Sequence, residues 1–381
     1  MTPFGFHTAK SVLFRPGGGA ELGPLAGAML GPRVLFVTDP GIRALGLADA
    51  ALAALGAGVM VFDRVEADPS LATLMAAVAA GGGASGVVGF GGGSAMDVAK
   101  LAALLLGSGE DLEAAWGVGN ARGPRLPLVL VPTTAGTGSE VTPVAIITVG
   151  AGEKRGVSSP LLLPDLALLD ADLTLGLPPA ITAATGVDAM VHAIEAYATI
   201  NANANPVSKM LARQALGLLG AHIETAVAEG GNRAARGAML LGAMLAGQAF
   251  ANAPVAAVHA LAYPLGGIYH IPHGLSNALV LPHVLAFNAP VAGTVYAEIA
   301  ADAFPALAGV EGSQARCAAF IAELAALSAR LGLPARLREM GIGADALPRL
   351  ARDAMKQTRL LVNNPRPLDE ADALAIYRAA W

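Results

Sequence analysis

The chain has 381 residues, a length that favours two domains over a single core. Hydrophobic residues make up 54% and charged residues 14%, the formal net charge is -5, and the lysines and arginines are scattered, so no basic footprint of a nucleic-acid-binding protein is present. A single cysteine, Cys317, excludes internal disulfides and metal sites built from several thiolates. We therefore expect any metal to be held by histidines and carboxylates.

The longest apolar run, Ala238 to Val258, does not predict a membrane span. It is interrupted by Gln248, Asn252 and Pro254, whereas a spanning helix needs about 20 predominantly apolar residues. We interpret this run as a buried helix and expect no membrane partner. Met1 to Lys10 lacks the basic start and apolar core of a secretory or transit segment, which favours a cytoplasmic protein.

The first half of the chain has the pattern of a parallel α/β sheet. From Arg33 to about Asp172, short β-branched runs alternate with Ala- and Leu-rich helical patterns. A further candidate, Ser11 to Phe14, is a strand that we consider for pairing with another subunit. The candidates for the sheet, with helices between the first four, are Val34 to Thr38, Val59 to Phe62, Gly86 to Phe90, Leu128 to Val131, Ala145 to Val149 and Leu166 to Leu169.

The second half of the chain is predicted to be helical. After Leu177-Pro178-Pro179 the strand signals stop, and Ile181 to Ala380 reads as helix after helix, punctuated by Asn, Gly and Pro. We expect an α/β domain with a Rossmann-like sheet in residues 1–178 and an all-α domain in residues 179–381.

A glycine turn in the first half predicts an anion site. Gly91-Gly92-Gly93-Ser94 follows the strand candidate Gly86 to Phe90 and precedes a helical stretch from Ala95 to Leu106. Glycines let the backbone approach an anion, Ser94 is a candidate helix cap, and the free N–H groups at the positive helix end attract a pyrophosphate. Asp97 and Lys100 fall on the first helical turns. Taken alone, the motif is equally consistent with an ordinary strand-to-helix turn.

A second loop, rich in hydroxyls, favours a dinucleotide. Pro132 to Glu140 follows the next strand at its predicted carboxyl end, where open α/β sheets bind ligands. Neither loop fits G-x-G-x-x-G or the Walker pattern, which makes the standard Rossmann fingerprint and a P-loop kinase poor fits. Asp39, directly after the strand Val34 to Thr38, is placed to bind an adenosine ribose and to repel a 2′-phosphate, which favours NAD over NADP. A helix cap before Pro40 is the alternative role of Asp39.

The second half carries candidate metal ligands. Asp188 and His192 are four residues apart in a helical pattern, Gly186 to Glu195, and so share one face. His259 and His273 follow in apolar surroundings, where an unpaired imidazole is costly. One Asp and three His give a divalent cation mixed oxygen and nitrogen ligation. Satisfied core histidines are the alternative, because spacing alone does not show that these residues converge.

Together these motifs resemble the iron-containing (group III) alcohol dehydrogenases, a family that includes lactaldehyde reductase and 1,3-propanediol dehydrogenase. The resemblance spans nearly the whole chain. It rests on Gly91 to Ser94 with Asp97 and Lys100, on Pro132 to Glu140, on Ala184 to Ala189 with His192, and on the segments around His259 and His273.

The resemblance implies a fold, an activity and site residues. It implies an α/β domain beside a helical one, as in dehydroquinate synthase-like proteins, and hydride transfer between NAD(H) and a small alcohol or carbonyl compound. By family analogy we also expect a homodimer or higher homo-oligomer. The implied metal ligands, for Fe2+ or alternatively Zn2+, are Asp188, His192, His259 and His273. The implied cofactor contacts are Asp39, Gly92, Gly93, Ser94, Asp97, Thr133, Thr134 and Thr137, with Thr142 and Lys154 matched less closely.

One departure from the family concerns the proton route. Many members have a histidine four residues after the third metal ligand, where this chain has Tyr263. Three routes for the proton are open: a relay through the Tyr263 hydroxyl, transfer by His270 from a nearby turn, or direct delivery by water. Tyr263 is also a candidate for merely shaping the pocket. The alternative activities are a metal- and NAD-dependent lyase resembling dehydroquinate synthase and a maleylacetate reductase-like enzyme.

Overall fold

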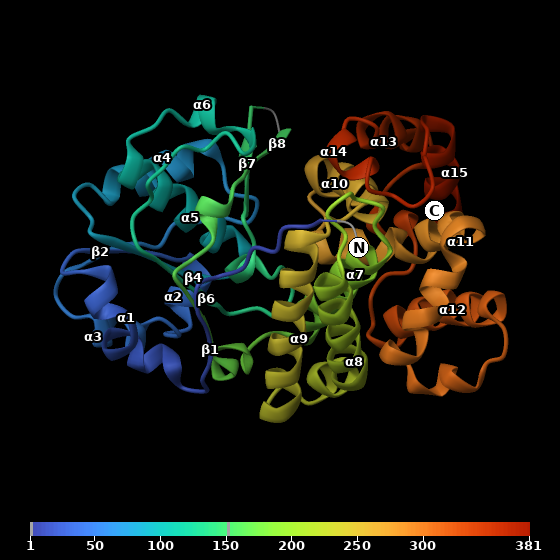
Figure 1. The fold of residues 1–381 in the computed structure, drawn as a ribbon, viewed down its shortest axis with the longest axis horizontal. Coiled ribbons are helices and arrows are strands. Elements are labelled where there is room, and N and C mark those ends of the chain that lie inside the picture. The colour runs from blue at the N-terminus through green and yellow to red at the C-terminus, as the bar shows by residue number, and fades with distance from the viewer. Residues whose placement is uncertain (1–2, 151–152) are drawn as a thin grey trace. The chain divides into compact units, whose positions relative to one another are not determined.

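The computed structural model describes residues 3–150 and 153–381 of the chain. Two compact units are distinguished: an α/β unit, His7–Gly176, and a helical unit, Leu177–Trp381, to which residues 3–6 also belong (Figure 1). The backbone N–H of Gly5 donates to Asn203 Oδ1 at 2.8 Å, and Asn203 Nδ2 donates to the carbonyl of Gly5 at 2.9 Å. The N-terminal residues thus pack with the helical unit, whereas the sequence analysis had assigned them to the α/β domain.

The α/β unit is built on a six-stranded parallel sheet with the strand order β1-β9-β6-β4-β2-β3. Helices connect its strands, as the alternation of patterns predicts. The strands of this sheet are β1 Val12–Phe14, β2 Val34–Val37, β3 Val59–Phe62, β4 Gly86–Gly91, β6 Leu128–Pro132 and β9 Leu166–Leu169. The helices of the unit are α1 Leu22–Leu30, α2 Pro40–Ala44, α3 Asp49–Leu55, α4 Leu71–Ala80, α5 Gly93–Ser108 and α6 Leu112–Ala115.

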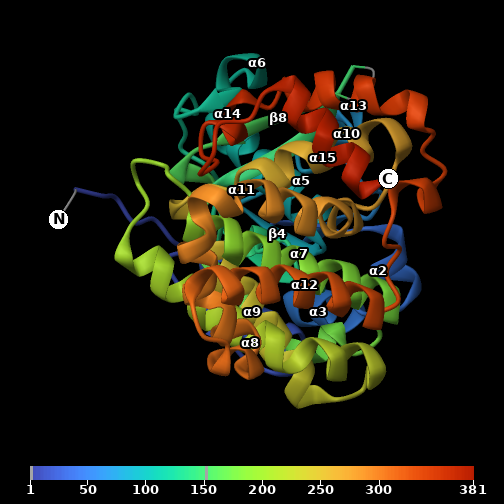
Figure 2. The same ribbon diagram turned by 90° about the vertical axis from the view of Figure 1, so that its right-hand side faces the viewer.

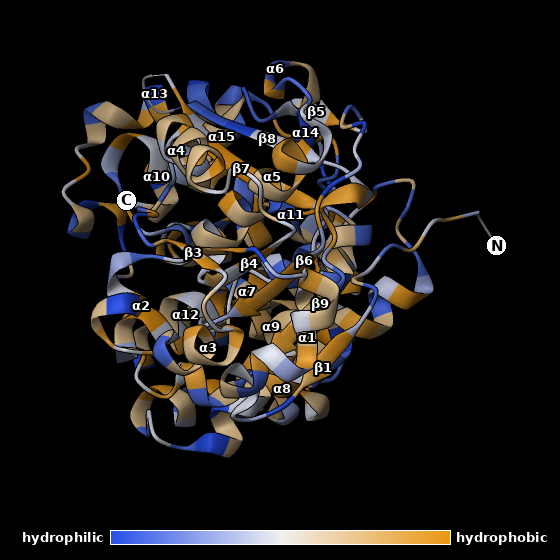
Figure 3. Ribbon diagram, turned by 90° about the vertical axis from the view of Figure 1, so that its left-hand side faces the viewer, coloured by the Kyte–Doolittle hydropathy of each residue, from blue (hydrophilic) through white to orange (hydrophobic). Residues whose placement is uncertain are grey.

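The central strands are hydrophobic on both faces because helices cover both. On β2, Leu35 and Val37 belong to one buried cluster with residues of α4 and α5, while Val34 and Phe36 belong to another with residues of α1 and α3. Alternate side chains of a strand point to opposite faces, so one strand supplies both cores. Figure 3 shows the resulting hydrophobic colouring of these strands.

Two of the predicted strands have different partners from those expected. β7, Val144–Val149, pairs antiparallel with β8, Glu153–Ser158, in a separate three-stranded sheet completed by β5, Gly117–Val118, and does not join the parallel sheet. β7 ends at Val149 and β8 begins at Glu153, and a connection this short suits antiparallel neighbours, whereas parallel neighbours need a long crossover. The candidate Ser11 to Phe14 forms β1, whose residues pair with β9 of the same chain.

The helical unit consists of helices throughout residues 177–381, all of which the structure describes. Figures 1 and 2 show α13, α14 and α15 at one end of this unit and α8 and α9 at the other. Its α-helices are α7 Pro179–Ala198, α8 Pro206–Ala228, α9 Arg233–Asn252, α10 Ala257–Tyr269, α11 His273–Ala303, α12 Ser313–Arg330, α13 Leu347–Ala354, α14 Thr358–Leu361 and α15 Glu370–Ala380.

The apolar run from Ala238 to Val258 is not one helix. α9 ends at Asn252, and α10 begins at Ala257 after a bend of 107°. Within the described residues, only α11 alone has the length and apolar composition of a membrane span. It contains Pro282 and Pro290, and it packs against α7, α8, α10, α12 and α15 inside the helical unit, as a core helix does.

Candidate functional site

Helix α7 presents the first two candidate ligands. Pro178 and Pro179 begin it, as proline suits the first turn of a helix, and it continues without interruption to Ala198. Asp188 and His192 are one turn apart and are 1% and 4% exposed. A carboxylate and an imidazole are therefore held side by side in the interior of the helical unit.

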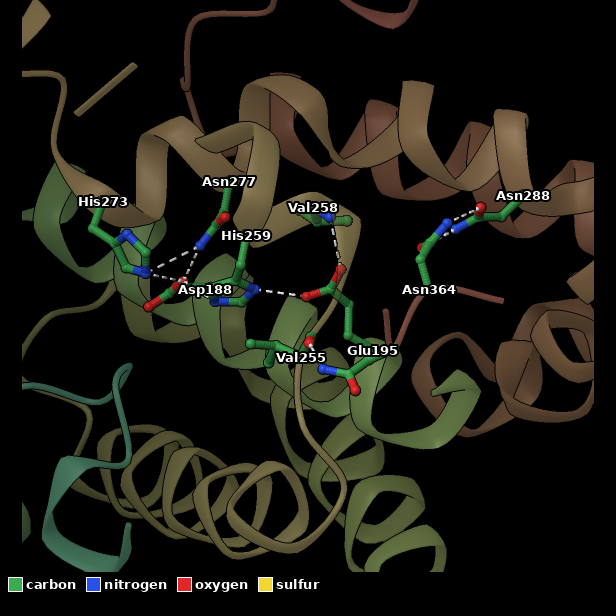
Figure 4. Close-up of polar contacts among 10 residues, drawn as sticks. Asp188, Glu195, Val255, Val258, His259, His273, Asn277, Asn288 and Asn364 are labelled. Carbon is green, nitrogen blue, oxygen red and sulfur yellow. Dashed lines mark hydrogen bonds and ion pairs between the residues drawn. The ribbon is translucent and has the colours of Figure 1, made fainter. Parts of the chain in front are cut away.

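The other two candidate ligands come from α10 and α11. His259 lies in the first turn of α10, and His273 is the first residue of α11. Asp188 Oδ1 lies 3.9 Å from His259 Nε2 and 3.7 Å from His273 Nε2, and the rings of His192 and His259 stack with centroids 4.7 Å apart. We call Asp188, His192, His259 and His273 the Asp188 cluster; each offers one ligand atom, and these four atoms lie within 4.8 Å of one another. Figure 4 shows three of them, Asp188, His259 and His273.

A glycine permits this close approach of α7 and α11. A Cβ placed on Gly274 would lie 2.3 Å from the carbonyl oxygen of Ala184 and 3.2 Å from Asp188 Cβ. Distances this short are not tolerated between real atoms, so only a residue without a Cβ allows the two backbones to touch here. The glycine after His273 thereby sets the distance between His273 and Asp188.

The donor set of the Asp188 cluster fits a divalent cation. Bonds of about 2.0–2.1 Å place neighbouring donors of a tetrahedral site roughly 3.4 Å apart, close to the separations found here. His259 Nε2 is buried and makes no hydrogen bond within the part of the chain that the structure describes. Burial alone would raise the pKa of Asp188, but the three imidazoles and the Asn277 amide outweigh it and hold that pKa below its usual value. An ionised carboxylate facing imidazole nitrogens is the arrangement that a cation stabilises.

Two residues that the sequence analysis did not single out hold the ligands in place. Glu195 Oε2 lies 2.6 Å from His259 Nδ1, and Asn277 Nδ2 donates to Asp188 Oδ1 at 2.6 Å (Figure 4). A signal for both was present, since Glu195 follows Asp188 by seven residues on one helix face and Asn277 follows His273 by four. Nothing in the sequence marked them as partners of ligands, because that depends on how the helices pack.

The two candidates for the proton route lie in different environments. The ring of Tyr263, one turn after His259 on α10, lies 6.0 Å from the ring of His273. His270 is exposed, and it caps the end of α10 in a left-handed conformation with φ 55°. The structure therefore brings Tyr263 to the Asp188 cluster and gives His270 a role in ending the helix.

The glycine turn of the α/β unit follows β4 and leads into α5. The N-cap of α5 is Gly92, with no side-chain cap, so the prediction that Ser94 caps the helix is wrong; Ser94 lies in the first turn. A Cβ on Gly93 would lie 3.0 Å from Thr137 Cγ2, so any larger residue there would press on the hydroxyl loop. The N–H groups at the start of α5 remain a suitable anion site.

Three segments meet at the carboxyl edge of the sheet, as the topology predicts. Thr133 N donates to the carbonyl of Gly91 at 3.0 Å, and the Cβ position of Gly92 is 3.8 Å from Thr134 Oγ1. Asp39, after β2, caps α2 by accepting from Ile42 N at 2.9 Å, which confirms the cap that was weighed as its alternative role. Its Oδ2 also lies 3.2 Å from the Cβ position of Gly91, beside the glycine turn.

A buried ammonium joins the glycine-turn helix to the hydroxyl loop. Lys100 Nζ donates to Ser139 Oγ at 2.7 Å, Thr142 Oγ1 at 3.1 Å and the Val144 carbonyl at 2.8 Å, and it lies 3.6 Å from Asp97 Oδ1. Asp97 in turn accepts from Ser139 Oγ at 2.7 Å and Ile146 N at 2.9 Å. We call Asp97, Lys100, Ser139, Glu140 and Thr142 the Lys100 cluster.

Burial controls the ionisation of the Lys100 cluster. It raises the pKa of Asp97, lowers that of Lys100 and raises that of Glu140 to about 7. Asp97 and Thr142, both predicted as cofactor contacts, have their polar atoms engaged inside this cluster. Lys154, on β8, donates to Thr148 Oγ1 at 3.0 Å and pairs with Asp68 at 2.5 Å.

The α/β unit combines a parallel sheet with a glycine turn and a hydroxyl loop, which suits a phosphate-bearing cofactor. The helical unit holds a cluster of one carboxylate and three imidazoles, which suits a divalent cation. The comparisons with known proteins agree. Residues 9–171 match the family model described as iron-containing alcohol dehydrogenase, and residues 182–381 match the model for the C-terminal part of that family.

The relatives cover between 91% and 100% of this chain. The long-chain-alcohol dehydrogenase 1 of Geobacillus thermodenitrificans is 43% identical over 91% of this chain and 89% of its own length. A crystal structure of 1,3-propanediol oxidoreductase superposes with a TM-score of 0.94 at 35% identity, covering 100% of both chains. Sulfoacetaldehyde reductase from Bifidobacterium kashiwanohense, solved in complex with NAD+, gives a TM-score of 0.87 at 29% identity over 100% of this chain and 99% of that one.

The chain belongs to the iron-containing alcohol dehydrogenase family. The predicted fold, family and class of enzyme, an oxidoreductase acting on alcohol groups, are thereby confirmed. The lyase alternative gains no support, since both family models and these relatives are alcohol dehydrogenases or carbonyl reductases.

Proposed function

We propose that this protein is a metal- and NAD(H)-dependent dehydrogenase that interconverts a small alcohol and its aldehyde or ketone. The observation that carries the proposal is the convergence of Asp188, His192, His259 and His273 on one point inside the helical unit. Family membership then supplies the reaction class. We further propose that the enzyme works in the cytoplasm as a homodimer or higher homo-oligomer, as expected from the sequence.

The four residues of the Asp188 cluster are the proposed ligands of the cation. One carboxylate and three neutral imidazoles leave one net positive charge when a divalent ion binds, which suits one anionic substrate oxygen. When bound, the cation supplies a Lewis acid that stabilises negative charge on that oxygen. Fe2+ is proposed from the family, and Zn2+ accepts the same ligands. The side chain of His273 is 40% exposed, whereas those of Asp188 and His259 are 2% and 3% exposed, so we propose that substrate approaches from the His273 side.

The glycine turn and the hydroxyl loop are the proposed cofactor site. The N–H groups at the start of α5 bind the pyrophosphate, and Gly92, Gly93, Ser94, Thr133, Thr134 and Thr137 surround it. Asp39 binds the adenosine ribose and disfavours a 2′-phosphate, so NAD is preferred over NADP. The NAD+ complex of the related sulfoacetaldehyde reductase supports this assignment. Asp97, Thr142 and Lys154 already have partners within the α/β unit, so we propose them as weaker cofactor contacts that chiefly support the loops around the site.

We propose Tyr263 as the group that relays the proton. Oxidation of an alcohol to a carbonyl removes a hydride, which passes to NAD+, and a proton, which leaves through the protein. Tyr263 lies against His273 and carries a hydroxyl that both accepts and donates. His270 is the less favoured candidate because it is exposed at the end of α10.

Metal analysis combined with a substrate panel tests the function. The protein is purified anaerobically, its bound metal is quantified, and NADH and NADPH oxidation are measured with aldehydes, ketones and 2-oxo acids over a range of chain lengths. We expect one divalent ion per chain and NADH oxidation by small uncharged carbonyl compounds. A chelator should remove the bound metal and abolish NADH oxidation, and added Fe2+ or Zn2+ should restore the activity. Full turnover by metal-free protein would overturn the proposal.

A further inference from the structure

Glu195 is a buried carboxylate on α7 that contacts the first turn of α10. It lies on α7, three residues after the ligand His192, and is 5% exposed. Its two oxygens have different partners: Oε1 accepts from Val258 N at 2.7 Å, and Oε2 lies 2.6 Å from His259 Nδ1 (Figure 4). Both partners lie in the first turn of α10.

The contact with Val258 supplies a cap that α10 lacks in its own sequence. The residue at the N-cap position is Ala256, which has no side chain able to accept a hydrogen bond. The first N–H groups of a helix need acceptors from outside the helix, and a carboxylate there also faces the positive end of the helix dipole. Glu195 therefore fixes the start of the helix that carries the third ligand.

The contact with His259 determines which ring nitrogen carries hydrogen. A carboxylate only accepts, so Nδ1 must be the donating N–H, and in the neutral ring Nε2 then presents a lone pair. Nε2 is the nitrogen that faces Asp188 Oδ1 at 3.9 Å and has no hydrogen bond in the described chain. The same carboxylate thus orients the ring and exposes the ligand atom.

We infer that Glu195 is the positioning residue of the metal centre: it holds His259 in the tautomer that binds a cation and anchors α10 in the orientation that brings this ring to Asp188. Asp188, His192 and Glu195 follow one another on one face of α7, so this helix provides two ligands and the support for a third. The inference rests on the proposed metal site but concerns the preparation of that site before the metal binds.

Glu195→Gln tests the tautomer of His259 without changing the packing around residue 195. The variant keeps the size of the side chain, and its carbonyl oxygen must turn to Val258 N–H, the partner that only donates. Its NH2 group then faces His259 Nδ1 and favours the tautomer with hydrogen on Nε2, the wrong one for a ligand. We expect Co2+ affinity of the full-length apoprotein, measured by chelator competition and by visible absorption, to fall about 10–100-fold. The thermal unfolding temperature of the apoprotein should change little.

Glu298→Gln is the matched control. Glu298 is on α11 and accepts from Tyr197 OH at 2.7 Å, another carboxylate contact between α7 and a second helix. We expect its Co2+ affinity to match that of the unchanged protein. If Glu195→Gln is folded and binds Co2+ as tightly as this control, the inference fails; if the unchanged protein binds no Co2+, the proposed function itself fails.

A measurement on the unchanged protein covers the case in which Glu195→Gln does not fold. The nitrogen chemical shifts of a 15N-labelled apoprotein distinguish the two imidazole tautomers, and His259 is assigned by comparison with His259→Asn. We expect hydrogen on Nδ1 of His259. Hydrogen on Nε2 would overturn the inference.

Discussion

The Lys100 cluster and the Asp188 cluster differ in how the charge of their buried carboxylate is balanced. In the Lys100 cluster, the ammonium of Lys100 donates hydrogen bonds to Ser139, Thr142 and the carbonyl of Val144, and it lies beside the carboxylate of Asp97. In the Asp188 cluster, three imidazoles and one carboxylate converge, and no lysine or arginine is among the described residues that contact Asp188. One cluster is complete in itself, and the other is suited to receive a cation.

The difference separates a buried charge that is balanced within the folded chain from one that we propose to serve a cation. A carboxylate that is paired by a lysine of its own unit fixes loops, since its interactions are satisfied in the folded chain. A carboxylate that faces metal-ligating nitrogens keeps a role that folding alone does not fulfil. The four predictions that follow would break or sharpen this contrast.

The largest effect is expected on removing a ligand of the Asp188 cluster. In His259→Ala we expect bound metal and alcohol-dependent NAD+ reduction to be lost together, by more than the roughly 10–100-fold cost of removing a residue that only supports a ligand. Metal content and turnover are measured on the same preparation. His222→Ala, outside the cluster, should keep both. Full turnover of His259→Ala without metal would contradict the ligand assignment.

Removing the internal cation of the other cluster should act on stability. Lys100→Met leaves Asp97 and three oxygen acceptors buried without their ammonium, which we expect to lower the free energy of unfolding by about 3–5 kcal/mol. Denaturant titration measures it. Lys10→Met removes a lysine whose side chain is 79% exposed in its pair with Asp165 and should cost at most about 1 kcal/mol. Equal losses in the two variants would remove the distinction.

Glu140 gives the Lys100 cluster a pH dependence. Burial raises its pKa from the ordinary 4.5 to about 7, so the folded state binds a proton more tightly than the unfolded state between these values. The contribution of Glu140 to stability is therefore highest below about pH 4.5 and declines as pH rises to about 7, on the order of 3 kcal/mol at about 1.4 kcal/mol per pKa unit. Unfolding free energies of the unchanged protein and Glu140→Gln across this range should diverge accordingly; parallel curves would refute the assignment.

The smallest effect concerns Asp39, whose two roles are separable. Asp39→Ala removes the cap of α2 and should cost about 1 kcal/mol of stability. Asp39→Asn keeps an oxygen that accepts from Ile42 N and should keep stability, but it removes the charge that repels a 2′-phosphate. Fluorescence titration should show a smaller preference for NADH over NADPH in both variants. An unchanged preference would leave Asp39 as a helix cap only.

Much of the fold was predictable because its signals are local. The runs at β2, β3, β4, β6 and β9 are apolar and short, and the helical pattern of α7 already placed Asp188 and His192 on one face. The antiparallel pairing of β7 was not predictable in this way, because the sequence of a strand does not specify which strand it pairs with. The break between α9 and α10 was also missed, although Asn252 and Pro254 lie beside it.

The site was predictable as a set of residues and not as an arrangement. The four candidate ligands followed from residue type and family resemblance, but their convergence depends on how α7, α10 and α11 pack. Spacing puts Glu195 and Asn277 on the same helix faces as Asp188 and His273, but their contacts with His259 and Asp188 depend on the same packing. The cap role of Ser94 failed because the helix begins at Gly93, two residues before the predicted start at Ala95.

Gly274 limits how this enzyme can be re-engineered. Because any β carbon at that position would overlap the carbonyl oxygen of Ala184, even alanine would push the first turn of α11 away from α7. A saturation library at residue 274 selected for turnover should return glycine almost alone. New substrate preferences must therefore be sought at positions such as Tyr263, which lies beside the ligands without setting the spacing of the helices that carry them.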